Sequence, residues 1–191
     1  MSNEKSKSSE QVSGDVVRKE GFVEGLSSGG VFTVTCYDKD GHEKWVDIAP
    51  NLVVNTGLQA MNTQFFTGSA YTAAWYIGLV NGTSASTTFS GGDTLATHAG
   101  WTENSSYVGT RKAASFGTAT LADPSNINNS ASAASFTMNA NATIAGAFLA
   151  NVASGTTGLF FSAADFQSPG DRTVVSGDVL NITYSFNLDA V

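Results

Sequence analysis

Residues 51–80, NLVVNTGLQAMNTQFFTGSAYTAAWYIGLV, contain the one convincing amphipathic helix and lead directly into a strongly apolar strand. One face of a 3.6-residue helical period is formed by four residues at positions i, i+3, i+4 and i+7: Leu58, Met61, Asn62 and Phe65. Asn55 is a suitable N-cap, and Gly68 stands where a helix would end. Because a helix of about three turns is not stable alone in water, we expect it to lie across a sheet that includes WYIGLV (75–80).

Short strands separated by turns are predicted for most of the remaining chain. The clearest pair is VFTVTCY (31–37) and HEKWVDI (42–48), joined by the turn Asp38-Lys39-Asp40-Gly41. Further strands are expected at 21–26, 106–112, 115–121, 158–166, 172–175 and 179–188, and 134–140 with 142–152 are expected to form a hairpin. No βαβ rhythm is present. The predicted fold class is all-β, an antiparallel β-sandwich or jelly roll with one short amphipathic helix.

The N-terminal segment differs from the rest of the chain in composition. Residues 1–19, MSNEKSKSSEQVSGDVVRK, are polar, mixed in charge and without a hydrophobic period, a pattern typical of chains that are disordered alone in water. We therefore divide the protein into an extended N-terminal arm (1–20) and a β-sandwich domain (21–191), and expect subunits outside the domain to hold the arm. The Gly/Ser/Thr-rich loop at 81–100 is long enough to be functional or to reach a neighbour.

Charged residues are scarce: they make up 13% of the 191 residues, against a usual share of about 25%. This composition suits a neutral surface covered by neighbours, and equally a turn-rich all-β domain. The net charge of −7 and the scattered basic residues argue against nucleic-acid binding. The single cysteine, Cys36, excludes an internal disulfide, and its place in a strand predicts burial. No signal peptide and no membrane-spanning run is recognised, so no membrane partner is expected.

Residues that could carry catalysis are few. The chain has two histidines, and one loop brings together three residues with metal-ligating side chains: Asp93, His98 and Glu103. Their spacing matches no established metal motif. We therefore predict no catalytic residue, no metal and no cofactor, and keep a metal-dependent or hydrolytic enzyme based on this loop as an alternative.

Aromatic residues offer a different kind of site. Trp75, Tyr76, Trp101 and Tyr107 are candidates for a sugar-stacking platform, since jelly rolls are a common lectin scaffold. The simpler interpretation is that Trp75 and Tyr76 alternate across one strand, with one side chain in the core and the other outside.

The order of motifs resembles that of tailed-bacteriophage virion structural proteins, among them capsid cement and decoration proteins. The resemblance covers most of the chain after residue 30 and rests on five motifs: W-x-D (45–47), N-x-V-x-N-x-G-L (51–58), WYIGL (75–79), GDT-x-A-x-HAGWTE (92–103) and SGD-x-L-x-I-x-Y (176–184). It implies a non-enzymatic protein that binds and stabilises the major capsid lattice. The alternative is a tail or head fibre or collar component that binds a glycan.

The same resemblance implies the partners and the location. We expect contacts with the major capsid protein or other virion subunits, a homo-oligomer, and a place on the capsid exterior after assembly in the host cytoplasm. Net acidity also suits the outer face of a capsid better than its DNA-lined interior. The expected partner-contact residues are Val16, Val17, Phe22, Trp75, Tyr76, Phe89 and Trp101.

Overall fold

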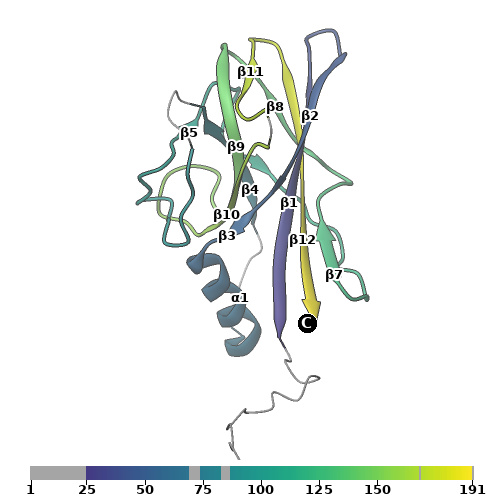
Figure 1. Ribbon diagram of the computed structural model, residues 1–191, viewed down its shortest axis with the longest axis vertical. Helices are drawn as coiled ribbons and strands as arrows, with labels where there is room; N and C mark the ends of the chain where they lie inside the picture. Colours follow the sequence, from purple (N-terminus) through teal and green to yellow (C-terminus); the bar gives the residue numbers. More distant parts are fainter. Residues whose placement is uncertain (1–24, 69–73, 83–86, 168, 191) are drawn as a thin grey trace, which may run out of the picture.

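Two antiparallel sheets face each other in the computed structural model, which describes residues 25–68, 74–82, 87–167 and 169–190 (Figure 1). Sheet A contains β1 (Leu26–Tyr37), β2 (Glu43–Pro50), β7 (Ser125–Asn128), β8 (Ala134–Thr137) and β12 (Val179–Ala190). Sheet B contains β3 (Leu52–Val53), β4 (Tyr76–Asn81), β5 (Glu103–Asn104), β6 (Lys112–Ala113), β9 (Ala142–Ala150), β10 (Phe160–Asp165) and β11 (Arg172–Val174). The predicted all-β antiparallel sandwich with one short helix is confirmed.

Sheet A is built on the long pair β1 and β12, whose register runs from Leu26 opposite Ala190 to Tyr37 opposite Val179. Its strand order is β2-β1-β12-β7, and β8 pairs with the other end of β12. The predicted β1–β2 hairpin is confirmed, with its turn closed by Gly41 at φ 86°. Inward residues of β1 alternate with outward ones, and Cys36 is fully buried as expected. Burial, followed by the nearby Asp178 carboxylate, raises the pKa of the Cys36 thiol to about 11.

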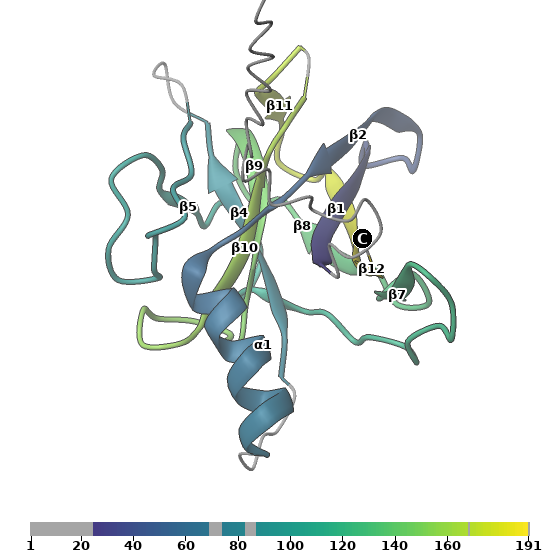
Figure 2. The ribbon, with the colours of Figure 1, turned by 60° about the horizontal axis from the view of Figure 1, so that its bottom comes forward.

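Sheet B has the order β3-β10-β9-β4-β5, with β11 paired to β9 and β6 to β4. The chain enters it from sheet A between Pro50 and Leu52, where β2 leads across the sandwich to β3 and the helix (Figure 2). Three expectations are wrong. The strand expected at 106–112 is reduced to an isolated bridge at Tyr107 and to Lys112, the first residue of β6. Segments 134–140 and 142–152 do not form a hairpin, because β8 pairs with β12 of sheet A whereas β9 lies in sheet B. Residues 115–121 form no strand and cross between the two sheets instead.

Sheet B is covered on both faces. One hydrophobic cluster fills the space between the sheets and includes Phe32, Phe136 and Leu149. A second lies against the opposite face of sheet B and includes Trp101, Phe148 and Phe160. Neighbouring residues of a strand point to opposite faces, so Phe148 and Leu149 belong to different clusters. Leu95 and Trp101 of the 81–100 loop belong to this second cluster, so this part of the loop covers sheet B, and its expected functional role stays a prediction.

Helix α1 (Asn55–Thr67) ends at Gly68 in the left-handed conformation, as predicted, but its N-cap is Val54 rather than Asn55. The expected buried face is wrong for Leu58 and Phe65, which are 40% and 83% exposed, whereas Met61 packs against the core. The helix packs instead through Gly57, where an added Cβ would lie 2.5 Å from the Phe161 carbonyl oxygen. At 13 residues, this one described helix falls well short of what a membrane span requires.

Candidate functional site

The expected partner-contact residues fall into three groups. Val16, Val17 and Phe22 lie outside the described residues. Trp75, Tyr76 and Phe89 are half-buried, and each has surface that a partner can reach. Trp101 is only 6% exposed, so its predicted exposure is wrong: the chain itself covers this side chain.

Trp101 is held by the loop residues that were candidate metal ligands. Its indole N–H donates to a carboxylate oxygen of Asp93 over 3.1 Å, and the same oxygen accepts the Ser90 backbone N–H over 3.0 Å. The His98 ring stacks on the indole at 3.9 Å, and its Nδ1 lies 2.9 Å from the Trp101 carbonyl oxygen. These contacts fix the loop over sheet B.

Glu103 points elsewhere, toward Arg111. The Arg111 guanidinium donates to both carboxylate oxygens of Glu103, over 2.8 and 2.7 Å, and also to the carbonyls of Val152 and Gly155. Asp93 and His98 thus contact Trp101, whereas Glu103 pairs with Arg111, so the three candidate ligands do not face one another. Among the described residues, no group of three or more His, Cys, Asp and Glu side chains is placed to share a metal ion.

The four aromatic residues considered for a sugar platform are not assembled on one surface. Tyr107 is buried in the inter-sheet core against Phe136, and burial raises the pKa of its hydroxyl to about 12. Trp101 belongs to the cluster on the far face of sheet B. Trp75 contacts Phe161 near α1, edge to face at 5.3 Å. The hypothesis that all four aromatic residues form one sugar-stacking surface is therefore wrong.

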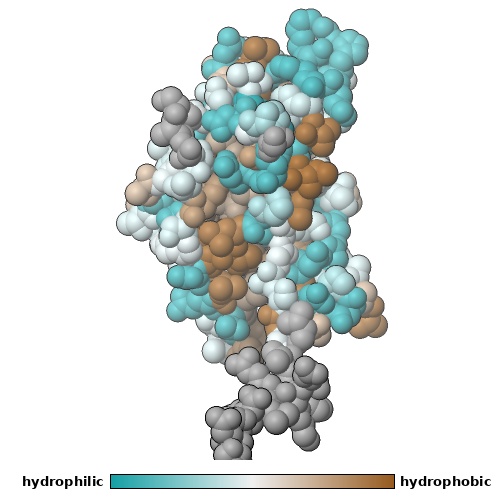
Figure 3. All heavy atoms as spheres, viewed as in Figure 1, coloured by the Kyte–Doolittle hydropathy of each residue, from teal (hydrophilic) through white to brown (hydrophobic). Residues whose placement is uncertain are grey.

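The structure instead places exposed apolar side chains along one continuous segment of the chain. This apolar stripe consists of Val46 and Ile48 on β2, Leu52 on β3, and Leu58, Phe65 and Phe66 on α1. The only charged residue within 46–66 is Asp47, which is buried and paired with Arg172. Figure 3 shows hydrophobic surface over β2 and again at β3, where the chain approaches α1.

The middle of the outer face of sheet A adjoins the β2 part of the stripe and carries no charged side chain. Three successive rows cross it from β2 through β1 to β12: Val46, Thr35 and Asn181; Ile48, Thr33 and Thr183; Pro50, Val31 and Ser185. The burial pattern of all three strands turns these side chains away from the core. The result is a surface of aliphatic, hydroxyl and amide groups.

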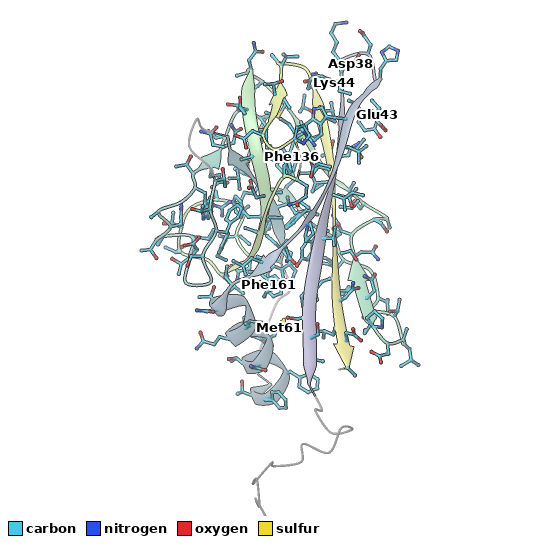
Figure 4. The ribbon with its side chains drawn as sticks, in the orientation of Figure 1. Asp38, Glu43, Lys44, Met61, Phe136 and Phe161 are labelled. Atoms are coloured by element: carbon cyan, nitrogen blue, oxygen red, sulfur yellow. The ribbon has the colours of Figure 1, made fainter. Side chains whose placement is uncertain are left out.

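An apolar cleft opens beside α1, at the end of the sandwich opposite the charged β1–β2 turn. Adjoining hollows of about 570, 420 and 200 Å³ share Trp75 and are lined further by Met61, Phe161, Phe116 and Ile127. Figure 4 shows Met61 and Phe161 at this end, far from Asp38, Glu43 and Lys44. The hollow of about 570 Å³ is also lined by residues 113–117, which lead from β6 toward β7.

Sequence reasoning missed the stripe and the cleft, although one signal pointed to the stripe. No charged residue lies between Asp47 and Asp93, and the stripe occupies the first part of that interval. Comparison of the chain with protein-family models, with curated protein sequences and with solved structures returned no match. The function proposed below therefore rests on the motifs of the sequence and on these surfaces.

Proposed function

We propose that this chain is a non-enzymatic structural subunit of a tailed-phage virion, a cement or decoration protein that binds the exterior of the major capsid lattice and stabilises it. The motif order of the sequence suggests the class of protein. The observation that carries the proposal is the set of three uncharged rows across the outer face of sheet A, bordered by the exposed Val46 and Ile48.

A face of this kind suits adhesion between proteins. Interface centres are poor in charged residues, since each buried charge costs desolvation free energy that its partner must offset. The three rows across β2, β1 and β12 contain hydroxyl and amide groups that can pair with a partner and aliphatic groups that gain from burial. Repetition over a closed shell then raises the effective affinity of a modest contact by about 10²–10⁴.

The N-terminal arm (1–20), which lies outside the described residues, is proposed to add a second point of attachment to neighbouring subunits. A glycan-binding fibre or collar component remains the alternative proposal. It has less support, because Trp101 and Tyr107 are buried and cannot stack on a sugar.

The test replaces Val46 and Ile48 together by lysine in the full chain and measures co-sedimentation with capsids assembled without this protein. Both side chains are exposed and point away from the core, so the sandwich should fold normally, as circular dichroism can check. We expect capsid affinity to fall at least about tenfold, which corresponds to about 1.4 kcal/mol.

The matched control is Val108→Lys, an exposed valine outside both sheets, which should bind as the unmodified protein does. Equal capsid binding by the Val46/Ile48 variant would rule out this face as the attachment surface. If the unmodified protein itself does not bind capsids, the proposed function is wrong.

A further inference from the structure

The C-terminal turn of α1 carries two aromatic side chains that stand out from the molecule. Phe65 and Phe66 are 83% and 77% exposed and pack edge to face, with ring centroids 5.0 Å apart. Two phenyl rings exposed together leave apolar surface in contact with water, and burying that surface against a partner is favourable. An exposed pair of this kind is typical of an interaction site rather than of a free surface.

The apolar cleft lies directly beside this aromatic pair. Met61 lines the cleft, and Phe65 follows it by four residues, so the two side chains are neighbours on one side of the helix. The cleft is lined on its other sides by aromatic and aliphatic residues of sheet A, chiefly Ile127 and Phe186.

We propose that α1 and the cleft form a two-fold interface between two copies of this chain, in which the Phe65–Phe66 pair of each copy enters the cleft of the other. A projection and a matching hollow at the same end of one molecule are what an isologous dimer needs, since each contact then occurs twice. The inference goes beyond the proposed function and concerns the free protein in solution.

Charge favours a second copy as the occupant. The chain has sixteen acidic and nine basic residues, so two copies repel each other through most approaches. α1 contains no charged residue, and neither does the lining of the three hollows. The α1 end is thus a place where two copies can meet without burying like charges.

The first experiment compares the full chain with the double variant Phe65→Gln/Phe66→Gln by sedimentation velocity over a range of concentrations. Glutamine is a good helix former and both positions are exposed, so the fold should be retained. We expect the unmodified protein to dimerise and the dissociation constant of the variant to rise at least about 30-fold. Leu121→Gln, at an equally exposed leucine outside the cleft, is the control and should dimerise normally.

The second experiment tests the geometry with opposite charges. Phe65→Glu places an acid on the projection, and Ile127→Lys places a base in the cleft; each variant alone should be monomeric. An equimolar mixture should form a heterodimer, because one contact pairs Glu with Lys and the other keeps the original Phe and Ile.

Several results would overturn the proposal. The first is an unmodified protein that stays monomeric at high concentration, and the second is a dimer that survives Phe65→Gln/Phe66→Gln. A dimer lost in Ile127→Lys but kept in the Phe65/Phe66 variant would show that another segment, such as the N-terminal arm, fills the cleft. Loss of capsid binding in the Phe65/Phe66 variant of a monomeric protein would assign the surface to a different virion subunit.

Discussion

Replacing Asn129 by alanine should lower the free energy of unfolding by about 2–4 kcal/mol. Asn129 is fully buried at the edge of β12, in the gap between the residues that pair with β7 and those that pair with β8. Its side-chain oxygen accepts the Tyr184 backbone N–H over 2.6 Å, and its amide nitrogen donates to the Ile182 carbonyl over 3.4 Å. The Asn129 side chain thus makes the hydrogen bonds to this part of β12 that a neighbouring strand would otherwise make.

The expected loss of stability follows from two buried backbone groups, the Tyr184 N–H and the Ile182 carbonyl, which would lose their side-chain partner in the alanine variant. A buried donor or acceptor left without a partner costs about 1–3 kcal/mol. The short bond to Tyr184 should cost more than the long one to Ile182. For a protein of this size, about 2–4 °C of melting temperature corresponds to each kcal/mol, so the melting temperature should fall by roughly 4–16 °C.

Urea unfolding followed by the fluorescence of the three tryptophans measures this loss. The midpoint should fall while the slope stays constant, because the surface exposed on unfolding hardly changes. Asn139→Ala, at an exposed asparagine, is the matched control and should change stability by less than about 0.5 kcal/mol. An equally small loss in Asn129→Ala would refute the view that this side chain completes the sheet.

Two further predictions concern charged side chains. Arg111→Lys should lower the free energy of unfolding by about 2 kcal/mol, which a lower melting temperature would show. Lysine keeps the charge, but it cannot hold Glu103 with two hydrogen bonds and also reach the carbonyls of Val152 and Gly155. Lys39→Arg, at an exposed lysine, should leave the melting temperature unchanged. Burial, and then the neighbouring Asp171 carboxylate, raise the pKa of Asp165. The folded state therefore favours protonated Asp165 more than the unfolded state does. The stability that this preference contributes is complete below the unfolded pKa of about 3.9 and is lost as the pH rises through the higher folded pKa. Asp165→Asn should accordingly be more stable than the unmodified protein at pH 7 and lose that advantage toward pH 4 in urea titrations; an advantage that grows in acid would contradict this assignment.

Local patterns in the sequence predicted the elements whose structure is decided locally. The β1–β2 hairpin was predictable because Asp38 to Gly41 form a turn and the flanking strands alternate strictly. The position of α1 was predictable from its helical period and from Gly68, which adopts the left-handed conformation that ends helices.

Pairing between distant segments was not predictable in the same way. Residues 134–152 have the alternation and the asparagine-rich turn of a hairpin, yet the turn passes the chain from one sheet to the other. The role of Asn129 was not predictable, because no local pattern reveals that its amide faces the edge of β12. Both outcomes depend on strands more than forty residues away in sequence.

The orientation of α1 shows how a small residue can override a hydrophobic pattern. Spacing alone assigns Leu58 and Phe65 to the buried face, because burying large apolar side chains gains the most free energy. Gly57 lets the helix backbone approach the Phe161 carbonyl so closely that no side chain fits between them, and this contact turns Leu58 and Phe65 outward. The free energy that these two side chains do not gain by burial within the chain is available to a contact outside it. The residues that spacing alone would bury are therefore among those we expect a partner to contact.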